Sequence, residues 1–265
     1  MKNEVIVQTC HRNVYDHAIR MVGVKMIEVD TKDELKAALN ERTAMLFVFG
    51  DAEERGQITT KEMAEIGHAH GVPTFVDAAA ERPDVPNWYL KQGADAVAYS
   101  GGKCLRGPQA SGLVLGRKDL LQAAFLNGAP HHALARPMKA GKEEIMGLLA
   151  AVEQWIERDH KAEWKEWERW LGVITDIVKD FDSVTTTIRE RGSRSNVAPV
   201  LEINWDAETV GINGTAVASQ LSAGEPRIEL NGNENGISIM PYMMEEGEDE
   251  IVAARIGEVL NSSQK

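Results

Sequence analysis

An acidic side chain and a lysine stand where the sequence predicts two strands to end. Asp77 follows the apolar run at 74–76, and Lys103 lies in the glycine-rich stretch YSGGKC after the run at 96–99. A lysine amine forms a Schiff base with an aldehyde. A carboxylate beside a pyridine nitrogen keeps that nitrogen protonated, so that the ring accepts electrons from a carbanion. Pyridoxal 5′-phosphate (PLP) chemistry requires this pair of side chains.

Other residues of the same block suit a phosphorylated cofactor. Ser100 could hydrogen-bond the phosphate, and Gly101 and Gly102 would let the backbone approach the cofactor closely. Each feature alone is weak, because glycine-flanked lysines are common in surface turns and a strand-end aspartate is usually a cap or turn residue. The order, spacing and strand context together favour a cofactor site.

The first half of the chain alternates short apolar strands with amphipathic helices. Thr31 with Glu34, and Thr59 with Glu62, have capping-box spacing at two helix starts. The pattern predicts a mostly parallel sheet covered on both faces, with ligands bound beyond the strand ends. Strands are expected at 4–8, 25–29, 45–49, 74–76, 96–99 and 113–115.

The second half predicts a long helical stretch at 142–179, possibly broken once, and then a small α/β domain. Its strands are expected at 184–188, 200–205, 227–230 and 237–240, and its helices at 215–221 and 248–260. The expected organisation is a large domain at 1–140, a linking helical segment at 141–180 and a small C-terminal domain at 181–265.

Composition narrows the class of protein. The 265 residues carry a net charge of −12, which disfavours a broad nucleic-acid-binding surface. The sequence has two cysteines and no apolar run of membrane-spanning length, and its start does not resemble a signal peptide, so the cytoplasm is the expected compartment. His131 and His132 are adjacent without a Cys or His cluster, and no metal site is expected.

Three segments resemble the fold-type I PLP enzymes: VDAAAE, YSGGKCLRGPQASGLVLGRKDLL and ARPMKAGKEEIMGLLAAVE. The nearest resemblance is to the group related to bacterial selenocysteine synthase (L-seryl-tRNA selenium transferase) and D-glucosaminate-6-phosphate ammonia-lyase. It implies the PLP-dependent transferase (aspartate aminotransferase-like) α/β fold, with PLP as cofactor. It also implies Lys103 as the Schiff-base lysine, Asp77 as the pyridine partner and Ser100 as a phosphate contact.

The resemblance suggests three further site residues. His11 is similar in position to the histidine that stacks on PLP in cysteine desulfurases, although a lone loop histidine is usually structural. Arg136 resembles a residue that lies close to the cofactor in the family. It could reach the cofactor across a dimer interface. Arg227 is a candidate for binding the substrate carboxylate, because a guanidinium suits bidentate recognition.

Two departures from the family pattern follow. Relatives begin with a segment that includes the phosphate-binding loop, and this chain opens on a later strand, so weak PLP binding by the chain and an exposed sheet edge are expected. Ala80 stands where the desulfurases carry a polar residue near the ring oxygen.

The expected function is a PLP-dependent lyase that eliminates a β-substituent and deaminates an amino acid or amino sugar acid, as a homo-oligomer. Selenium transfer, transamination and racemisation begin with the same steps and stay open. A PLP-fold remnant without activity is the alternative from another class.

Overall fold

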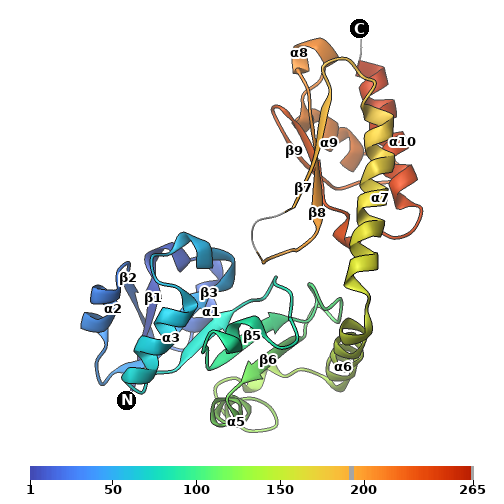
Figure 1. Cartoon of the computed structure of the whole chain (residues 1–265). Helices are drawn as coiled ribbons and strands as arrows, with labels where there is room; N and C mark the ends of the chain where they lie inside the picture. Colours follow the sequence, from blue (N-terminus) through green and yellow to red (C-terminus); the bar gives the residue numbers. More distant parts are fainter. Residues whose placement is uncertain (191–193, 264–265) are drawn as a thin grey trace. The chain divides into compact units, whose positions relative to one another are not determined.

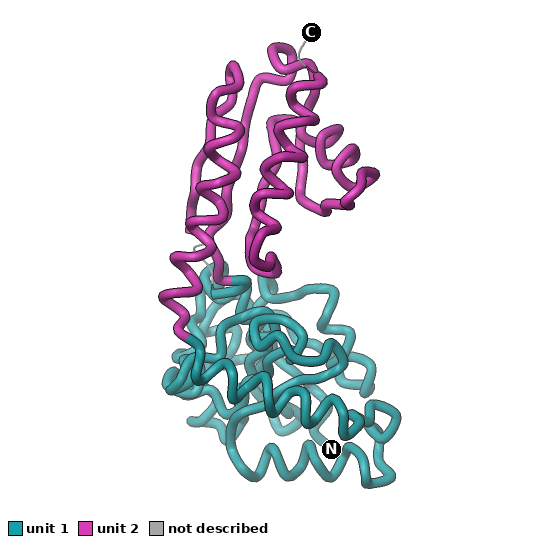
Figure 2. Tube along the Cα trace, turned by 90° about the vertical axis from the view of Figure 1, so that its right-hand side faces the viewer, with its two compact units in different colours: residues 1–158, 193–196 teal, residues 159–192, 197–265 magenta. Residues whose placement is uncertain are grey.

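The structure is a computed structural model that describes residues 1–190 and 194–263. The chain forms two compact units (Figure 2): residues 1–158 with 193–196, and residues 159–192 with 197–265. Helix α6 (Lys142–Glu157) belongs to the first unit and α7 (His160–Val178) to the second. The break between them is at Asp159, whose side chain caps α7 by accepting from the backbone N–H groups of Lys161 and Ala162.

The first unit is built on a six-stranded sheet of order β2-β1-β3-β4-β5-β6 (Figure 1). The first five strands pair in parallel and β6 runs antiparallel to β5, which confirms the predicted mostly parallel sheet. The strands are β1 (Glu4–Gln8), β2 (Lys25–Val29), β3 (Thr43–Phe49), β4 (Thr74–Asp77), β5 (Ala96–Ser100) and β6 (Gly112–Gly116).

Alternation along the strands gives the sheet two apolar faces. Ile6 of β1 belongs to the larger core with Leu35 of α2 (Lys32–Ala38) and Met63 of α3 (Thr60–Ala69), whereas Val5 belongs to a smaller cluster with Ile19. Capping boxes begin both α2 and α3, as their Thr-x-x-Glu spacing predicts. The other helices of this unit are α1 (His17–Arg20), α4 (Trp88–Lys91) and α5 (Lys118–Asn127).

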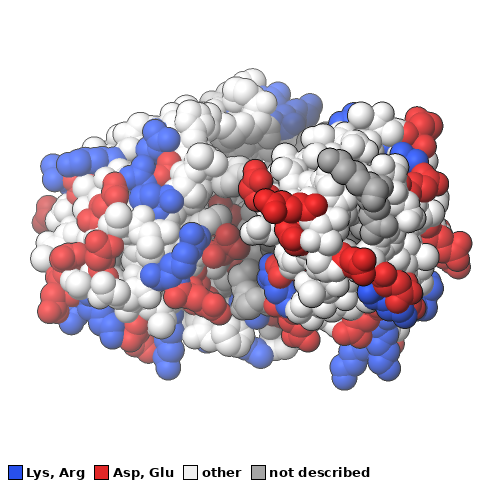
Figure 3. Space-filling model, turned by 90° about the horizontal axis from the view of Figure 1, so that it is seen from above, with Lys and Arg blue, Asp and Glu red and all other residues white. Residues whose placement is uncertain are grey.

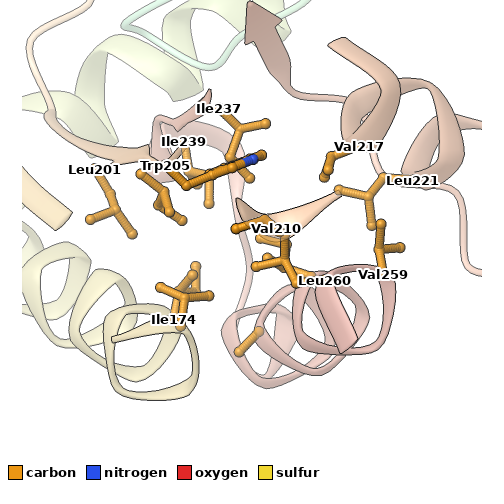
Figure 4. Close-up of a cluster of buried hydrophobic side chains, with 14 of the residues drawn as sticks. Ile174, Leu201, Trp205, Val210, Val217, Leu221, Ile237, Ile239, Val259 and Leu260 are labelled. Atoms are coloured by element: carbon orange, nitrogen blue, oxygen red, sulfur yellow. The ribbon is translucent and has the colours of Figure 1, made fainter. Parts of the chain in front are cut away.

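The second unit packs an antiparallel sheet of order β7-β8-β10-β9 against helices α7, α9 and α10. Figure 4 shows the apolar side chains between them, among them Ile174 of α7, Leu201 of β8 and Leu260 of α10. The element bounds are β7 (Thr185–Glu190), β8 (Pro199–Asn204), α8 (Ala207–Val210), α9 (Gly214–Ser222), β9 (Asn231–Asn233), β10 (Gly236–Ile239) and α10 (Glu248–Ser263).

The strand expected at 227–230 is wrong, because the third strand of this sheet is β9 at Asn231–Asn233. The Ile228 N–H donates to the carbonyl of Leu221 at the end of α9, at 3.0 Å, rather than to a neighbouring strand. Ile228 and Leu230 still pack against the core, which explains the strand-like alternation of apolar residues.

Charged side chains of both signs are interspersed over the face that Figure 3 shows. Among residues 1–190 and 194–263, no helix has both the length and the apolar character needed to cross a membrane.

Candidate cofactor site

Asp77 and Lys103 line one cavity of about 390 Å³ in the first unit. Strands β4 and β5 pair in parallel, with Asp77 opposite Ala98, so both chains leave the sheet at the same edge. Asp77 is the last residue of β4, and Lys103 follows the end of β5 by three residues. The cavity volume is in the range of small-molecule sites.

The turn that carries Lys103 is closely packed. The Gly101 N–H donates to the Ser111 carbonyl at 2.9 Å, and the Ser100 N–H donates to the Ala79 carbonyl at 3.1 Å. A Cβ atom on Gly101 would lie 1.9 Å from Ser111 Oγ. The structure therefore gives this glycine a packing role, which is additional to the predicted approach of backbone to cofactor.

The Asp77 carboxylate suits a cationic partner. Burial raises the pKa of Asp77, while the N–H of Ala79, at 3.1 Å from Oδ1, and the charge of Lys103 act in the opposite direction. A positive ring nitrogen would compensate the desolvated carboxylate. The amine and the half-buried carboxylate on one cavity are therefore a donor set that fits PLP.

Tyr15 also lines the cavity, a position that no motif in the sequence predicted. The Nζ atom of Lys103 lies 5.8 Å from the centre of the Tyr15 ring. Tyr15 follows His11 in the segment TCHRNVYDHA, so the segment was recognised but its cavity-lining residue was not.

Glu81 also lines the cavity, and only 1% of its surface is exposed. The Tyr89 hydroxyl lies 2.7 Å from both carboxylate oxygens, and Arg194 Nε lies 3.5 Å from Oε2. Burial raises the pKa of Glu81 to about 7, and these two partners oppose that rise. The glutamate ends the motif VDAAAE, and its cavity position was not predicted.

The segment 194–196, distant in sequence, completes the cavity wall. Ser195 and Asn196 are lining residues, and the Asn196 N–H donates to the Ala80 carbonyl at 2.8 Å. No motif in the sequence pointed to either residue.

The other predicted site residues lie elsewhere. His11 is buried, and its Nδ1 accepts from the Phe49 N–H at 3.3 Å; burial lowers its pKa to about 4, so the ring is neutral at pH 7. Arg136 begins a short 3-10 helix, Arg136–Met138. Among the described residues around the cavity, His11, Ser100 and Arg136 do not line it.

Arg227 belongs to the second unit, where its Nε donates to Glu229 at 2.7 Å. In the part of the chain that the structure describes, no three His, Cys, Asp or Glu side chains are grouped to hold a metal ion.

A family model, related sequences and a solved structure all match this chain and agree on its family. The Aminotransferase class-V model matches residues 12–138. The chain is 29% identical to D-glucosaminate-6-phosphate ammonia lyase of Salmonella typhimurium, over 98% of this chain and 71% of that protein. It is 31% identical to 5′-C-glycyluridine monooxygenase-decarboxylase of a Streptomyces species, over 97% of this chain and 67% of that protein.

A solved structure of D-glucosaminate-6-phosphate ammonia-lyase superposes with a TM-score of 0.83 at 28% identity, covering 99% of this chain and 72% of that one. The L-seryl-tRNA(Sec) selenium transferase of Photorhabdus laumondii is 29% identical but matches only 49% of this chain. These matches confirm the predicted family and fold. The chain belongs to the class-V aminotransferase family, whose members are fold-type I enzymes that use PLP.

Proposed function

We propose that this chain is a PLP-dependent lyase that eliminates a β-substituent from a 2-amino acid or amino sugar acid and releases ammonia and a 2-oxo acid. The observation that carries the proposal is the meeting of Lys103 and Asp77 at one cavity. Similarity to an ammonia lyase over 98% of the chain supports the reaction class.

PLP, when bound, supplies an aldehyde and an electron-accepting ring. Lys103 would hold the aldehyde through its amine, and its Nζ, when free, would take the proton from the substrate carbon that bears the amine. The Asp77 carboxylate would keep the proton on the ring nitrogen. Loss of that carbon-bound proton and of the β-substituent with its bonding electron pair would leave an enamine, whose imine tautomer water would hydrolyse to ammonia and the 2-oxo acid.

The other predicted residues keep their roles as proposals. Ser100 would contact the phosphate, His11 would stack on the cofactor ring, Arg136 would approach the cofactor within a homo-oligomer, and Arg227 would bind the substrate carboxylate. The proposed compartment is the cytoplasm.

Selenium transfer is the second candidate. The net charge of −12 disfavours it, because binding tRNA requires clustered lysine and arginine.

The test is reduction of the PLP-loaded protein with borohydride, followed by peptide mapping. The label is expected on Lys103, absent from Lys103→Arg and retained in Lys91→Arg, a change of an exposed lysine on α4. A label on another lysine would refute the assignment. Release of 2-oxo acid from candidate amino acids and amino sugar acids then tests the reaction. A labelled protein that converts none of them would favour the inactive alternative.

A further inference from the structure

A cluster of charged side chains beside the cavity has no part in the chemistry described above. Its centre is Arg194, which pairs with Glu81 at 3.5 Å and with Asp84. Its guanidinium carbon also lies 4.9 Å from the centre of the Trp88 ring. Arg194 therefore connects the segment 194–196 to two positions that follow β4 in the chain.

The fold makes room for the Glu81 carboxylate. A Cβ atom on Gly50 would lie 1.9 Å from Glu81 Oε1 and 2.7 Å from the Tyr89 hydroxyl oxygen. The glycine therefore leaves the space that the buried carboxylate and its hydroxyl donor occupy. A buried carboxylate needs such partners, because an unpaired charge in the interior is costly.

The cluster holds the segment 194–196 against the residues that follow Asp77. Glu81 and Ser195 form an isolated antiparallel β-bridge, and the Asn196 N–H donates to the Ala80 carbonyl at 2.8 Å. Asn196 has a φ of 48°, a left-handed conformation that asparagine tolerates better than most residues. These contacts place Asn196 at the cavity that Asp77 and Lys103 also line.

We infer that Arg194 is a positioning residue, which holds Asn196 where its side-chain amide contacts a polar group of the cofactor bound at Lys103. The inference rests on the proposed function. Residues 78, 79 and 80, which line the cavity after Asp77, are all alanine, and their side chains make no hydrogen bonds. The side chain of Asn196 therefore adds a hydrogen-bonding group to this part of the wall. A buried polar group of a ligand requires a partner, and the Asn196 amide offers both a donor and an acceptor.

The inference has a pH signature, because the Glu81 carboxylate titrates. The groups that face it are Tyr89 from α4, Arg194, and Asp51 and Glu53 from the 3-10 helix Gly50–Arg55. With its pKa raised to about 7 by burial, Glu81 is charged and attracts Arg194 above that pH and is neutral below it. The affinity of the wild-type protein for PLP should therefore decrease as the pH falls through about 7. The decrease that depends on Glu81 should be absent in Glu81→Gln.

The experiment is a titration of the apoprotein with PLP, followed by absorbance and tyrosine and tryptophan fluorescence. Asn196→Gly removes the amide and keeps a residue that accepts the left-handed backbone. Arg194→Ala removes the positioning group. Arg189→Ala is the matched control, because Arg189 pairs with Glu202 across β7 and β8 in the second unit.

Asn196→Gly and Arg194→Ala should each weaken PLP binding by about tenfold and shift the absorbance maximum of the Lys103-linked cofactor, whereas Arg189→Ala should do neither. If Arg194→Ala does not fold, Asn196→Gly and the pH profile of Glu81→Gln decide. Wild-type affinity and spectrum in Asn196→Gly would overturn the inference and leave the proposed function intact. Failure of the wild-type protein to form any adduct at Lys103 would overturn the proposed function and the inference together.

Discussion

The buried carboxyl group of Glu81 should make folding stability fall as the pH rises towards neutrality. Its pKa in the folded protein is about 7, against an ordinary value of 4.5. Between these two pH values the folded state binds more protons than the unfolded state. The stability that Glu81 contributes is therefore fully present below about pH 4.5 and is lost as the pH rises through about 7.

The magnitude follows from the interval between the two pKa values, which corresponds to about 3 kcal/mol above neutral pH. The folded value already reflects the attraction of Arg194 and the hydrogen bond that the Tyr89 hydroxyl donates to the carboxylate. Glutamine has the shape of a neutral carboxylic acid but does not titrate. Glu81→Gln should therefore match the wild type near pH 5 and exceed its unfolding free energy by up to about 3 kcal/mol near pH 8.

Urea unfolding followed by circular dichroism, at about one-unit steps from about pH 5 to about pH 8, measures this difference. Glu62→Gln is the control, because the pKa of Glu62 is shifted in the opposite direction: the hydrogen bond from Lys32 lowers it to about 2. The stability that Glu62 contributes is present above about pH 4.5 and is lost as the pH falls through about 2. The difference in unfolding free energy between Glu62→Gln and the wild type should therefore stay constant between about pH 5 and about pH 8. Parallel curves for the wild type and Glu81→Gln would refute the reasoning.

Three further outcomes are expected. Asp77→Ala should keep the borohydride-trapped label but lower turnover by several powers of ten, measured as 2-oxo acid release; near-normal turnover would show that the carboxylate does not serve the ring nitrogen. Gly50→Ala places a Cβ 1.9 Å from Glu81 Oε1 and should cost about 1–3 kcal/mol in urea unfolding. Its control, Gly172→Ala within α7, meets no atom within 4 Å and should stabilise by about 0.5–1 kcal/mol. Thr59→Ala should cost about 1 kcal/mol by removing the capping box of α3, and an unchanged unfolding midpoint would contradict that role.

Local patterns were enough to predict the six strands of the first unit and its helices α2 and α3. All six strands lie within two residues of their expected bounds, because short apolar runs flanked by polar or glycine residues have few other ways to be buried. The meeting of Asp77 and Lys103 was also predictable, since parallel strands end at one sheet edge.

Residues brought to the cavity by tertiary contacts could not be predicted in this way. Asn196 reaches it through its hydrogen bond to Ala80, the β-bridge between Glu81 and Ser195 and the ion pairs of Arg194, none of which leaves a periodic signal. The strand predicted at 227–230 was wrong for a related reason. Alternation of apolar and polar residues indicates which side chains are buried, but it does not indicate whether the backbone pairs with another strand.

The path of the chain through segment 194–196 has a consequence for how the protein is made. Lys103 and Asp77 leave the ribosome early, but this part of the first unit is encoded between β7 and β8 of the second. During synthesis the cavity wall therefore stays open until most of the chain has been translated, and its closure must bring together residues far apart in sequence. A nascent chain that ends after α6 contains Lys103 and Asp77 but not Asn196, which lines the same cavity.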